Sequence, residues 1–208
     1  MRIDWYFDFV SPFAYLQWQR LKVAPWREDI VPRPMLFAAL LGRMEQRGPA
    51  EIPRKREFTY RHAQFRADRA GIRMRFPPAH PFNPLAALRL CVAAGNTPTA
   101  IDAIFDHLWH EGLRGDDAQS LAPVAVRLGI TDPSQLATAE VKSALQSNFD
   151  DAVAQQVFGV PTLAVEGELF WGEDATDLFE ALLADPALFA AAEMQRLGAL
   201  PVGAARKP

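Results

Sequence analysis

Ser11 and Pro12 are the residues whose types and placement most clearly indicate chemistry. Ile3, Trp5 and Phe7 alternate with polar residues before them, a pattern typical of a half-buried strand. Pro12 suits the first position of a helix, which places Ser11 at the N-cap, beside unpaired N–H groups and the positive end of the helix dipole. Such a junction can hold an anion, although Ser-Pro is also a common way to begin a helix with no further role.

The other reactive side chains give weaker signals. Cys91 is the only cysteine, so no intrachain disulfide and no dithiol chemistry is possible, and its apolar surroundings predict a buried thiol. His107 and His110 are three residues apart beside Glu111, but nothing nearby completes a ligand set. We therefore interpret both as surface or capping histidines and predict no metal.

Composition indicates an ordinary soluble globular protein. The 208 residues are 50% hydrophobic and 23% charged, with a net charge of −3. This balance gives no electrostatic case for nucleic acid or an anionic membrane, and no apolar run approaches the ~20 residues that span a bilayer. Without a secretory signal, the expected location is cytoplasmic.

The first half of the chain predicts a short second strand and a charged helical region. Pro32 and Pro34 confine the strand within residues 29–37 to a sheet edge. Nine cations follow between residues 40 and 73, most of them expected on a solvated helix face. Residues 48–53 are loop-like, and the run from Pro53 to Arg56 is interpreted as a turn followed by three cations that could face an acidic substrate.

Four further helices and a hairpin follow. Asn83-Pro84 and Thr97-Pro98 are start signals, and apolar spacing predicts two more helices over residues 118–128 and 139–156. Residues 163–171 predict a β-hairpin with its turn at Glu166-Gly167. Asp174 with Asp177 resembles a capping box for the last helix, and residues 200–208 are expected to be loose.

This order is that of a thioredoxin fold interrupted by an α-helical domain, and three motifs make the resemblance specific. They are Asp8-Phe9-Val10-Ser11-Pro12, Phe158-Gly159-Val160-Pro161-Thr162 and Leu169-Phe170-Trp171-Gly172-Glu173-Asp174. Together they resemble the 2-hydroxychromene-2-carboxylate isomerase family, which is similar to kappa-class glutathione transferases and belongs to the DsbA-like branch. The predicted α/β architecture is a discontinuous thioredoxin-like domain (residues 1–42 and 138–200), an inserted all-α domain (43–137) and a tail (201–208).

The resemblance implies glutathione as the cofactor. Its sulfur would lie at Ser11 and Pro12, its backbone would pair with Val160 before a cis Pro161, and its γ-glutamyl end would lie near Trp171, Gly172, Glu173 and Asp174. Asp174 could pair with the γ-glutamyl ammonium or simply cap the helix. Because neither end of Ser11-Pro12-Phe13-Ala14 is a cysteine, disulfide exchange is excluded.

The resemblance also implies an aromatic carboxylate substrate and a homodimer. Arg43, Arg54 or Lys55 would bind the carboxylate. Asn83 could contact the substrate or cap a helix. The chain departs from the family pattern at Arg47-Gly48-Pro49, where family members commonly carry an Asn and a longer loop. The alternatives are a glutathione transferase or isomerase acting on another electrophile, and a non-catalytic binding protein that retains the groove.

Overall fold

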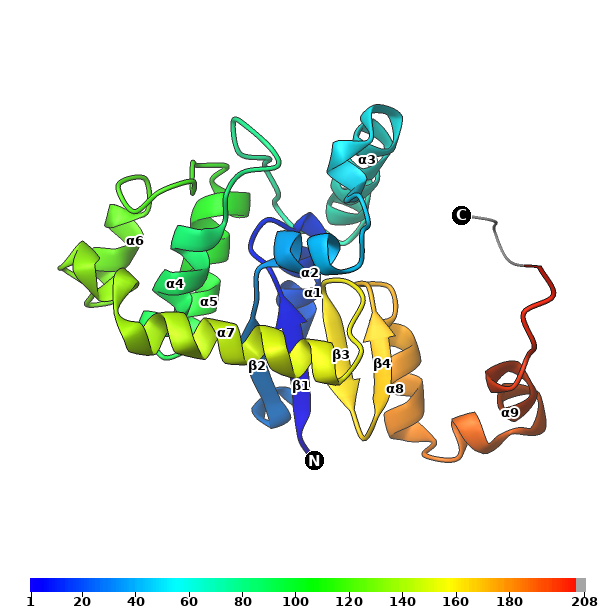
Figure 1. Cartoon of the computed structure of the whole chain (residues 1–208). Helices are drawn as coiled ribbons and strands as arrows, with labels where there is room; N and C mark the ends of the chain where they lie inside the picture. Colours follow the sequence, from blue (N-terminus) through cyan, green and yellow to red (C-terminus); the bar gives the residue numbers. More distant parts are fainter. Residues whose placement is uncertain (205–208) are drawn as a thin grey trace.

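A four-stranded sheet forms the centre of the computed structural model, which describes residues 1–204. Its strands are β1 (Ile3–Phe7), β2 (Ile30–Pro34), β3 (Thr162–Val165) and β4 (Glu168–Trp171), in the order β2-β1-β3-β4 (Figure 1). β2 is parallel to β1, whereas β3 is antiparallel to both β1 and β4. The strand predicted from the alternating apolar pattern is present as β1, but all five of its residues are buried, so the expected half-buried strand is wrong in its exposure. The proline-containing strand lies at the sheet edge as expected, and the hairpin is confirmed.

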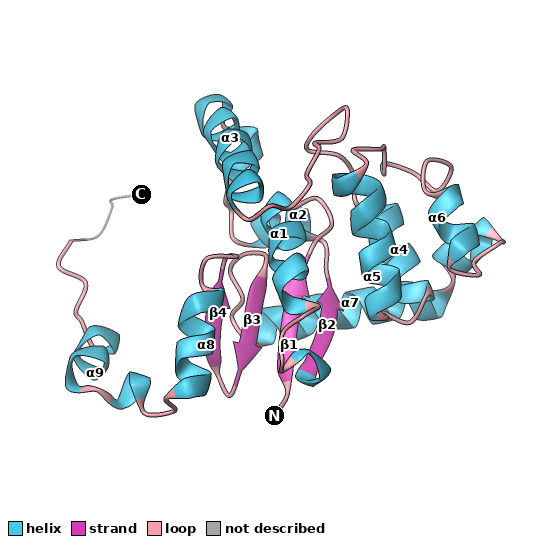
Figure 2. Cartoon of the chain, turned by 180° about the vertical axis from the view of Figure 1, so that it is seen from behind, coloured by secondary structure: helices cyan, strands magenta, loops and turns pink. Residues whose placement is uncertain are grey.

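Helices cover both faces of the sheet. α1 (Pro12–Leu21) and α8 (Thr176–Ala184) lie against one face, as Figure 2 shows from behind. α7 (Ala139–Ala154) crosses the other face, with α2 (Phe37–Arg43) above it in Figure 1. The central strands β1 and β3 therefore lie between two layers of helices.

The segment between α2 and α7 is helical, and its long helix α3 projects beyond the rest (Figures 1 and 2). Its helices are α3 (Pro53–Arg69), α4 (Leu85–Ala93), α5 (Pro98–Phe105) and α6 (Ala122–Arg127), with a π-helical turn at Asp106–His110 and short 3-10 turns at Pro49–Glu51 and Pro133–Ala137. Two more short turns, Arg27–Asp29 and Leu188–Ala190, and the helix α9 (Ala192–Gly198) lie outside this segment.

One aromatic core joins the sheet to the helical segment. Trp5 and Phe7 stack with their ring centroids 4.0 Å apart, and Phe9 lies 4.7 Å from Phe105 of α5. All four rings are fully buried. Cys91 is also fully buried, which confirms the sequence expectation, and burial raises its pKa.

Several helix ends differ from the sequence predictions. Pro53 is the first residue of α3, so Arg54, Lys55 and Arg56 lie in a helix, not after a turn. α6 begins at Ala122, four residues later than expected. Asp174 and Asp177 form no capping box, because α8 begins at Thr176 and has no side-chain cap. The chain also forms α9 beyond the predicted last helix.

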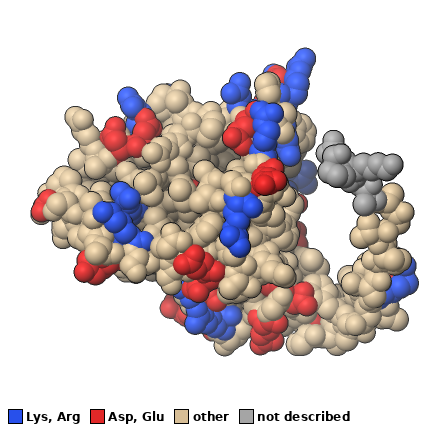
Figure 3. Space-filling view, viewed as in Figure 1, with Lys and Arg blue, Asp and Glu red and all other residues tan. Residues whose placement is uncertain are grey.

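Residues 199–204 form no helix or strand, and the remainder of the predicted loose tail, 205–208, lies outside the described residues. Acidic and basic side chains intermix over the face in Figure 3, including α3, where Arg54 and Arg61 both pair with Glu57. Within residues 1–204, no helix has the length and apolar character needed to cross a membrane.

Candidate active site

The sheet topology brings the three sequence motifs to one end of the central strands. β1 ends at Phe7 and leads to Ser11. β3 begins at Thr162, and because it is antiparallel to β1, its start lies beside the end of β1. Thr162 also pairs with Trp171 at the end of β4, and Gly172 N donates to Pro161 O over 2.9 Å. The loops after β1, before β3 and after β4 therefore meet.

Ser11 caps α1 and is 8% exposed. Its Oγ accepts a hydrogen bond from Ala14 N at 3.2 Å, and its own N–H donates to Asp8 O. The predicted N-cap is thus confirmed. A serine hydroxyl has one proton and two lone pairs, so Ser11 can accept the capping bond and still donate its proton to an anion. The N-terminus of the ten-residue helix α1 adds its positive dipole end at the same place.

Asp8 holds the loop that leads to Ser11. Its side chain is fully buried, with Oδ1 accepting from Val10 N at 3.1 Å and Oδ2 from Phe37 N at 2.8 Å. The Asp8 carboxyl therefore joins the Ser11 loop to the start of α2. Burial raises the pKa of Asp8 to about 7, although its backbone hydrogen bonds oppose the rise.

If the Ser11 loop is taken as the first wall of the candidate site, Val160 and Pro161 form the second. The peptide bond between these two residues is cis. The pairing of β1 with β3 begins at Tyr6 and Thr162, so Val160 lies beyond the last ladder pair. Thr162 Oγ1 donates to Gly159 O at 2.8 Å and holds the turn before the strand. The structure thus places Val160 at the end of a strand, next to Pro161, which has no N–H to donate.

Trp171 and Gly172 form the third wall. A Cβ at Gly159 would lie 2.3 Å from Trp171 Nε1, so only glycine lets the indole pack this closely. Gly172 adopts a φ of +99°, and a Cβ there would lie 2.5 Å from Asp174 Oδ1. Because α8 has no side-chain cap, the capping alternative for Asp174 is wrong.

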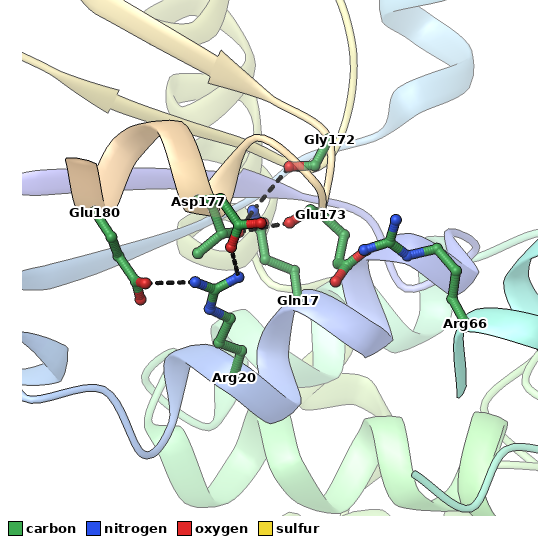
Figure 4. Close-up of polar contacts among 8 residues, drawn as sticks. Gln17, Arg20, Arg66, Gly172, Glu173, Asp177 and Glu180 are labelled. Carbon is green, nitrogen blue, oxygen red and sulfur yellow. Dashed lines mark hydrogen bonds and ion pairs between the residues drawn. The ribbon is translucent and has the colours of Figure 1, made fainter. Parts of the chain in front are cut away.

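Glu173 is held by the protein itself (Figure 4). Its Oε2 lies 2.7 Å from Nη2 of Arg66, which reaches across from α3. Behind this loop, the fully buried Gln17 donates to Gly172 O at 3.1 Å and to Thr176 Oγ1 at 3.0 Å. The Gly172–Glu173 backbone is therefore fixed to α1, and the Glu173 carboxylate already has a cation.

Two further residues next to Ser11 escaped the sequence prediction. His80 Nε2 lies 2.7 Å from Val10 O, and His80 Nδ1 lies 2.7 Å from the Tyr60 hydroxyl. The imidazole thus bonds to the peptide that precedes Ser11. Nothing in the local pattern around His80 or Tyr60 signals this contact, because the two residues are 20 positions apart and both are far from Ser11 in the sequence.

The predicted substrate-binding residues lie on several elements. Arg43 is exposed at the end of α2, and Arg54 and Lys55 are exposed at the start of α3. Asn83 Oδ1 accepts from Leu85 N at 3.0 Å, but α4 begins at Leu85 with Pro84 at its N-cap and has no side-chain cap, so Asn83 lies one residue before the N-cap position predicted for it. Asn83 also lines a cavity of about 290 Å³.

Ser11 has the surroundings of an anion-binding donor. In the part of the chain that the structure describes, the Ser11 hydroxyl has no hydrogen bond to a histidine, the base that activates a nucleophilic serine. The helix N-terminus and the half-satisfied hydroxyl both favour negative charge in front of Ser11. Its arrangement therefore suits the stabilisation of a bound anion.

A mixed four-stranded sheet, with a helix shortly after β1 and a cis-proline before β3, is typical of the thioredoxin-like class. The family model of the DSBA-like thioredoxin domain matches residues 2–184. The chain therefore belongs to the DSBA-like thioredoxin domain family.

Curated relatives carry isomerase and transferase names. The chain is 27% identical to a 2-hydroxychromene-2-carboxylate isomerase of Pseudomonas putida, over 88% of this chain and 94% of the relative. It is 24% identical to glutathione s-transferase kappa 2 of Caenorhabditis elegans, over 88% of this chain and 92% of that protein.

Solved structures share the fold. A 2-hydroxychromene-2-carboxylate isomerase superposes with a TM-score of 0.75 at 23% identity, covering 97% of this chain and all of that one. The cytosolic disulfide reductase DsbM of Pseudomonas aeruginosa, whose structure contains GSH, gives a TM-score of 0.59 at 14% identity, covering 88% of this chain and all of that one.

Proposed function

We propose that the protein is a glutathione-dependent isomerase that interconverts 2-hydroxychromene-2-carboxylate and trans-o-hydroxybenzylidenepyruvate. The observation that carries this proposal is Ser11, which caps α1 with a hydroxyl proton left to donate, in a site that contains no cysteine. A site that favours a thiolate but lacks a thiol needs one from a cofactor. The name of the Pseudomonas putida relative supports the substrate and the class of reaction, and the product is what the family resemblance implies.

Glutathione would extend across the three walls of the site. Its sulfur would accept a hydrogen bond from the Ser11 hydroxyl, and its backbone would add a strand beside Val160, where the ladder ends. The γ-glutamyl ammonium would pair with Asp174, because the neighbouring carboxylate of Glu173 already pairs with Arg66. Pro12 and Pro161 would shape the sulfur end, and Trp171 and Gly172 the γ-glutamyl end.

The proposed reaction is addition, rotation and elimination. The thiolate adds to the conjugated system of the substrate, and the former double bond becomes a single bond that can rotate. Expulsion of the thiolate then restores the double bond in its new geometry and regenerates glutathione. Ser11 stabilises the thiolate, which increases the population of the nucleophile before addition. The same hydrogen bond stabilises the charge that develops on sulfur as the thiolate is expelled, which lowers the barrier to elimination.

The substrate carboxylate needs a cation, and we propose Arg43, Arg54 or Lys55 for that role. Arg54 pairs with Glu57 at 3.2 Å, an exposed contact that a substrate can replace at little cost. Asn83 could also contact the substrate, because its hydrogen bond from Leu85 N occupies only Oδ1 and leaves its NH2 group to donate. We also propose that the protein works as a homodimer, as the family resemblance implies.

A kappa-type transferase acting on another electrophile is the second candidate, favoured by the Caenorhabditis elegans relative. It would use the same glutathione site and differ in the wall that faces the electrophile. A non-catalytic glutathione-binding protein would bind the cofactor without turnover. The assay below separates these three candidates.

The test is the isomerisation of 2-hydroxychromene-2-carboxylate with and without glutathione. We expect Ser11→Ala to lower kcat/KM by roughly 100-fold, the usual cost of removing one donor to a developing anion. Ser143→Ala, on the exposed face of α7, is the matched control. Calorimetry with glutathione measures binding separately, and thermal melts account for the loss of the N-cap.

Each outcome discriminates. Isomerisation that needs no glutathione contradicts the mechanism, as does a Ser11→Ala variant with wild-type activity. Glutathione binding without any isomerisation rejects the substrate and leaves the transferase, which conjugation assays with other electrophiles would reveal. Binding without turnover on any electrophile leaves the non-catalytic candidate.

A further inference from the structure

Both ring nitrogens of His80 take part in a connected set of hydrogen bonds next to Ser11. Nε2 lies 2.7 Å from Val10 O, and Nδ1 lies 2.7 Å from Tyr60 Oη. Tyr60 Oη is also 2.7 Å from the backbone carbonyl of His80. Three contacts thus join the imidazole, one phenol and two carbonyl groups.

The number of protons in this set depends on the charge of His80. A neutral ring protonated at Nε2 donates to Val10 O, and the single Tyr60 proton must serve either Nδ1 or the His80 carbonyl. Two protons then serve three contacts. In the imidazolium, Nδ1–H donates to Tyr60 Oη, and Tyr60 O–H donates to the carbonyl. Protonation therefore completes the set and breaks no bond.

The surroundings keep His80 neutral in the absence of a nearby anion. The rings of Phe76, Phe82 and Trp109 pack around the imidazole, and burial lowers the pKa of His80 below its ordinary value. The charged groups near the set are Asp8, which accepts from Val10 N in the same loop, and Arg56 on α3. Burial raises the pKa of Tyr60, and the charge of Arg56 opposes this rise. An anion in front of Ser11 would add a negative charge near the imidazole and favour its protonation.

We propose that His80 is a positioning residue that takes up a proton when an anionic thiolate binds at Ser11. The S–H bond of the thiol breaks, its electron pair stays on sulfur, and an N–H bond forms at His80 Nδ1, so that the net release of protons to solvent falls. The bond from Nε2 to Val10 O holds the peptide before Ser11 in both states. This inference rests on the proposed binding of glutathione.

Calorimetry of glutathione binding in buffers of different ionisation enthalpy measures the protons released. Near neutral pH, wild type is expected to bind the thiolate and release clearly less than one proton. His80→Gln retains an N–H donor for Val10 O but cannot take up a proton, so its release is expected to approach one. S-methylglutathione, which has no thiol proton, is the control ligand.

The ultraviolet absorbance of bound thiolate, followed against pH, gives a second measurement. The pKa of bound glutathione is expected to be about one unit higher in His80→Gln, a tenfold smaller thiolate population at a given pH below it. Tyr60→Phe, at a half-buried position, removes the partner of Nδ1 without changing the ring and is expected to shift both readouts in the same direction. His110→Gln is the matched control.

The two proposals can fail separately. If wild type and His80→Gln both bind thiolate and both release one proton, the role of His80 is overturned and the glutathione site stands. If wild type does not bind glutathione as a thiolate, the proposed function is overturned and the His80 inference with it. Altered binding of S-methylglutathione by His80→Gln, with unchanged proton release, would also reject proton uptake by His80.

Discussion

At the scale of single residues, titratable groups bind both the backbone N–H and the backbone carbonyl of Val10. Asp8 accepts from its N–H, and His80 bonds to its carbonyl oxygen. Ser11 follows directly, so its position depends on a buried carboxyl and a half-buried imidazole. The protonation of these two groups therefore affects the loop that carries the candidate catalytic hydroxyl.

Asp8 should make folding stability depend on pH. Its pKa is about 7 in the fold and near 3.8 in the unfolded chain, so between these values the folded protein binds more protons. The Asp8 contribution to the free energy of unfolding is therefore fully present below pH ~4 and declines as pH rises to about 7. Thermal melts across this range should show a decline that Asp8→Asn reduces.

The Asn variant costs a hydrogen bond of its own. Its NH2 group cannot accept from Val10 N or Phe37 N, so one donor loses its partner, at about 1–3 kcal/mol. Asp68→Asn, on the exposed face of α3, is the matched control and should keep the wild-type pH dependence. An unchanged pH profile in Asp8→Asn would show that another group causes the decline.

The sequence predicted residues whose roles are local. Ser11 and Thr97 cap the helices that begin directly after them, and both caps are present. Asn83 bonds to Leu85 N but lies one residue before the N-cap of α4. The sequence could not predict His80 and Tyr60, because their contacts with the Ser11 loop depend on how α3 and the loop before α4 fold back onto β1. Asp8 belongs to the alternating pattern that predicted the first strand, but nothing in the sequence indicated that its side chain accepts a hydrogen bond from Phe37 N.

At the scale of elements, α3 is tied to the site by Arg66. Its guanidinium pairs with Glu173 in the loop after β4, and this carboxylate is only 15% exposed. Arg66→Met leaves the partly buried charge unpaired, so amide hydrogen exchange of residues 172–174 should become about fivefold faster, from a local cost of about 1 kcal/mol. Exchange measured by NMR tests this prediction.

Arg69→Met is the matched control. Arg69 is exposed on the same helix and forms no ion pair within residues 1–204. Unchanged exchange of residues 172–174 in Arg66→Met would indicate that the Gln17 hydrogen bonds alone fix this loop.

Element predictions succeeded where apolar residues recur at a regular spacing, even in β1, which is buried on both faces. β1, α7 and the hairpin follow their apolar periodicity, whereas element ends depend on turns that periodicity does not report. Gly172 adopts a positive φ, so the chain turns once more before α8 starts at Thr176 and Asp174 is too early to cap it. Pro53 was interpreted as a turn residue, but proline is equally suited to a first helical position, as it is in α3.

At the scale of the whole molecule, the sheet and the inserted helices share one core. Phe105 of α5 contacts Phe7, Phe9 and Tyr15, with ring centroids 4.7–6.0 Å apart. Trp109 Nε1 donates to Phe9 O at 2.8 Å, and Asp102 binds both Trp18 and Lys22. Separate unfolding of the helical segment would expose this aromatic face, so the two parts should unfold together.

Phe105→Ala tests this coupling. Removal of a fully buried ring at the junction should lower the free energy of unfolding by about 3–5 kcal/mol, and Phe65→Ala, on an exposed ring of α3, should change it by less than about 0.5 kcal/mol. Far-ultraviolet circular dichroism follows all helices, whereas tryptophan fluorescence follows the five tryptophans, of which all but Trp109 lie outside the helical segment between α2 and α7. Coincident transitions, both shifted to lower denaturant in Phe105→Ala, are expected because the ring is shared. If only the helical signal moves, the two parts unfold independently and the shared core does not couple them.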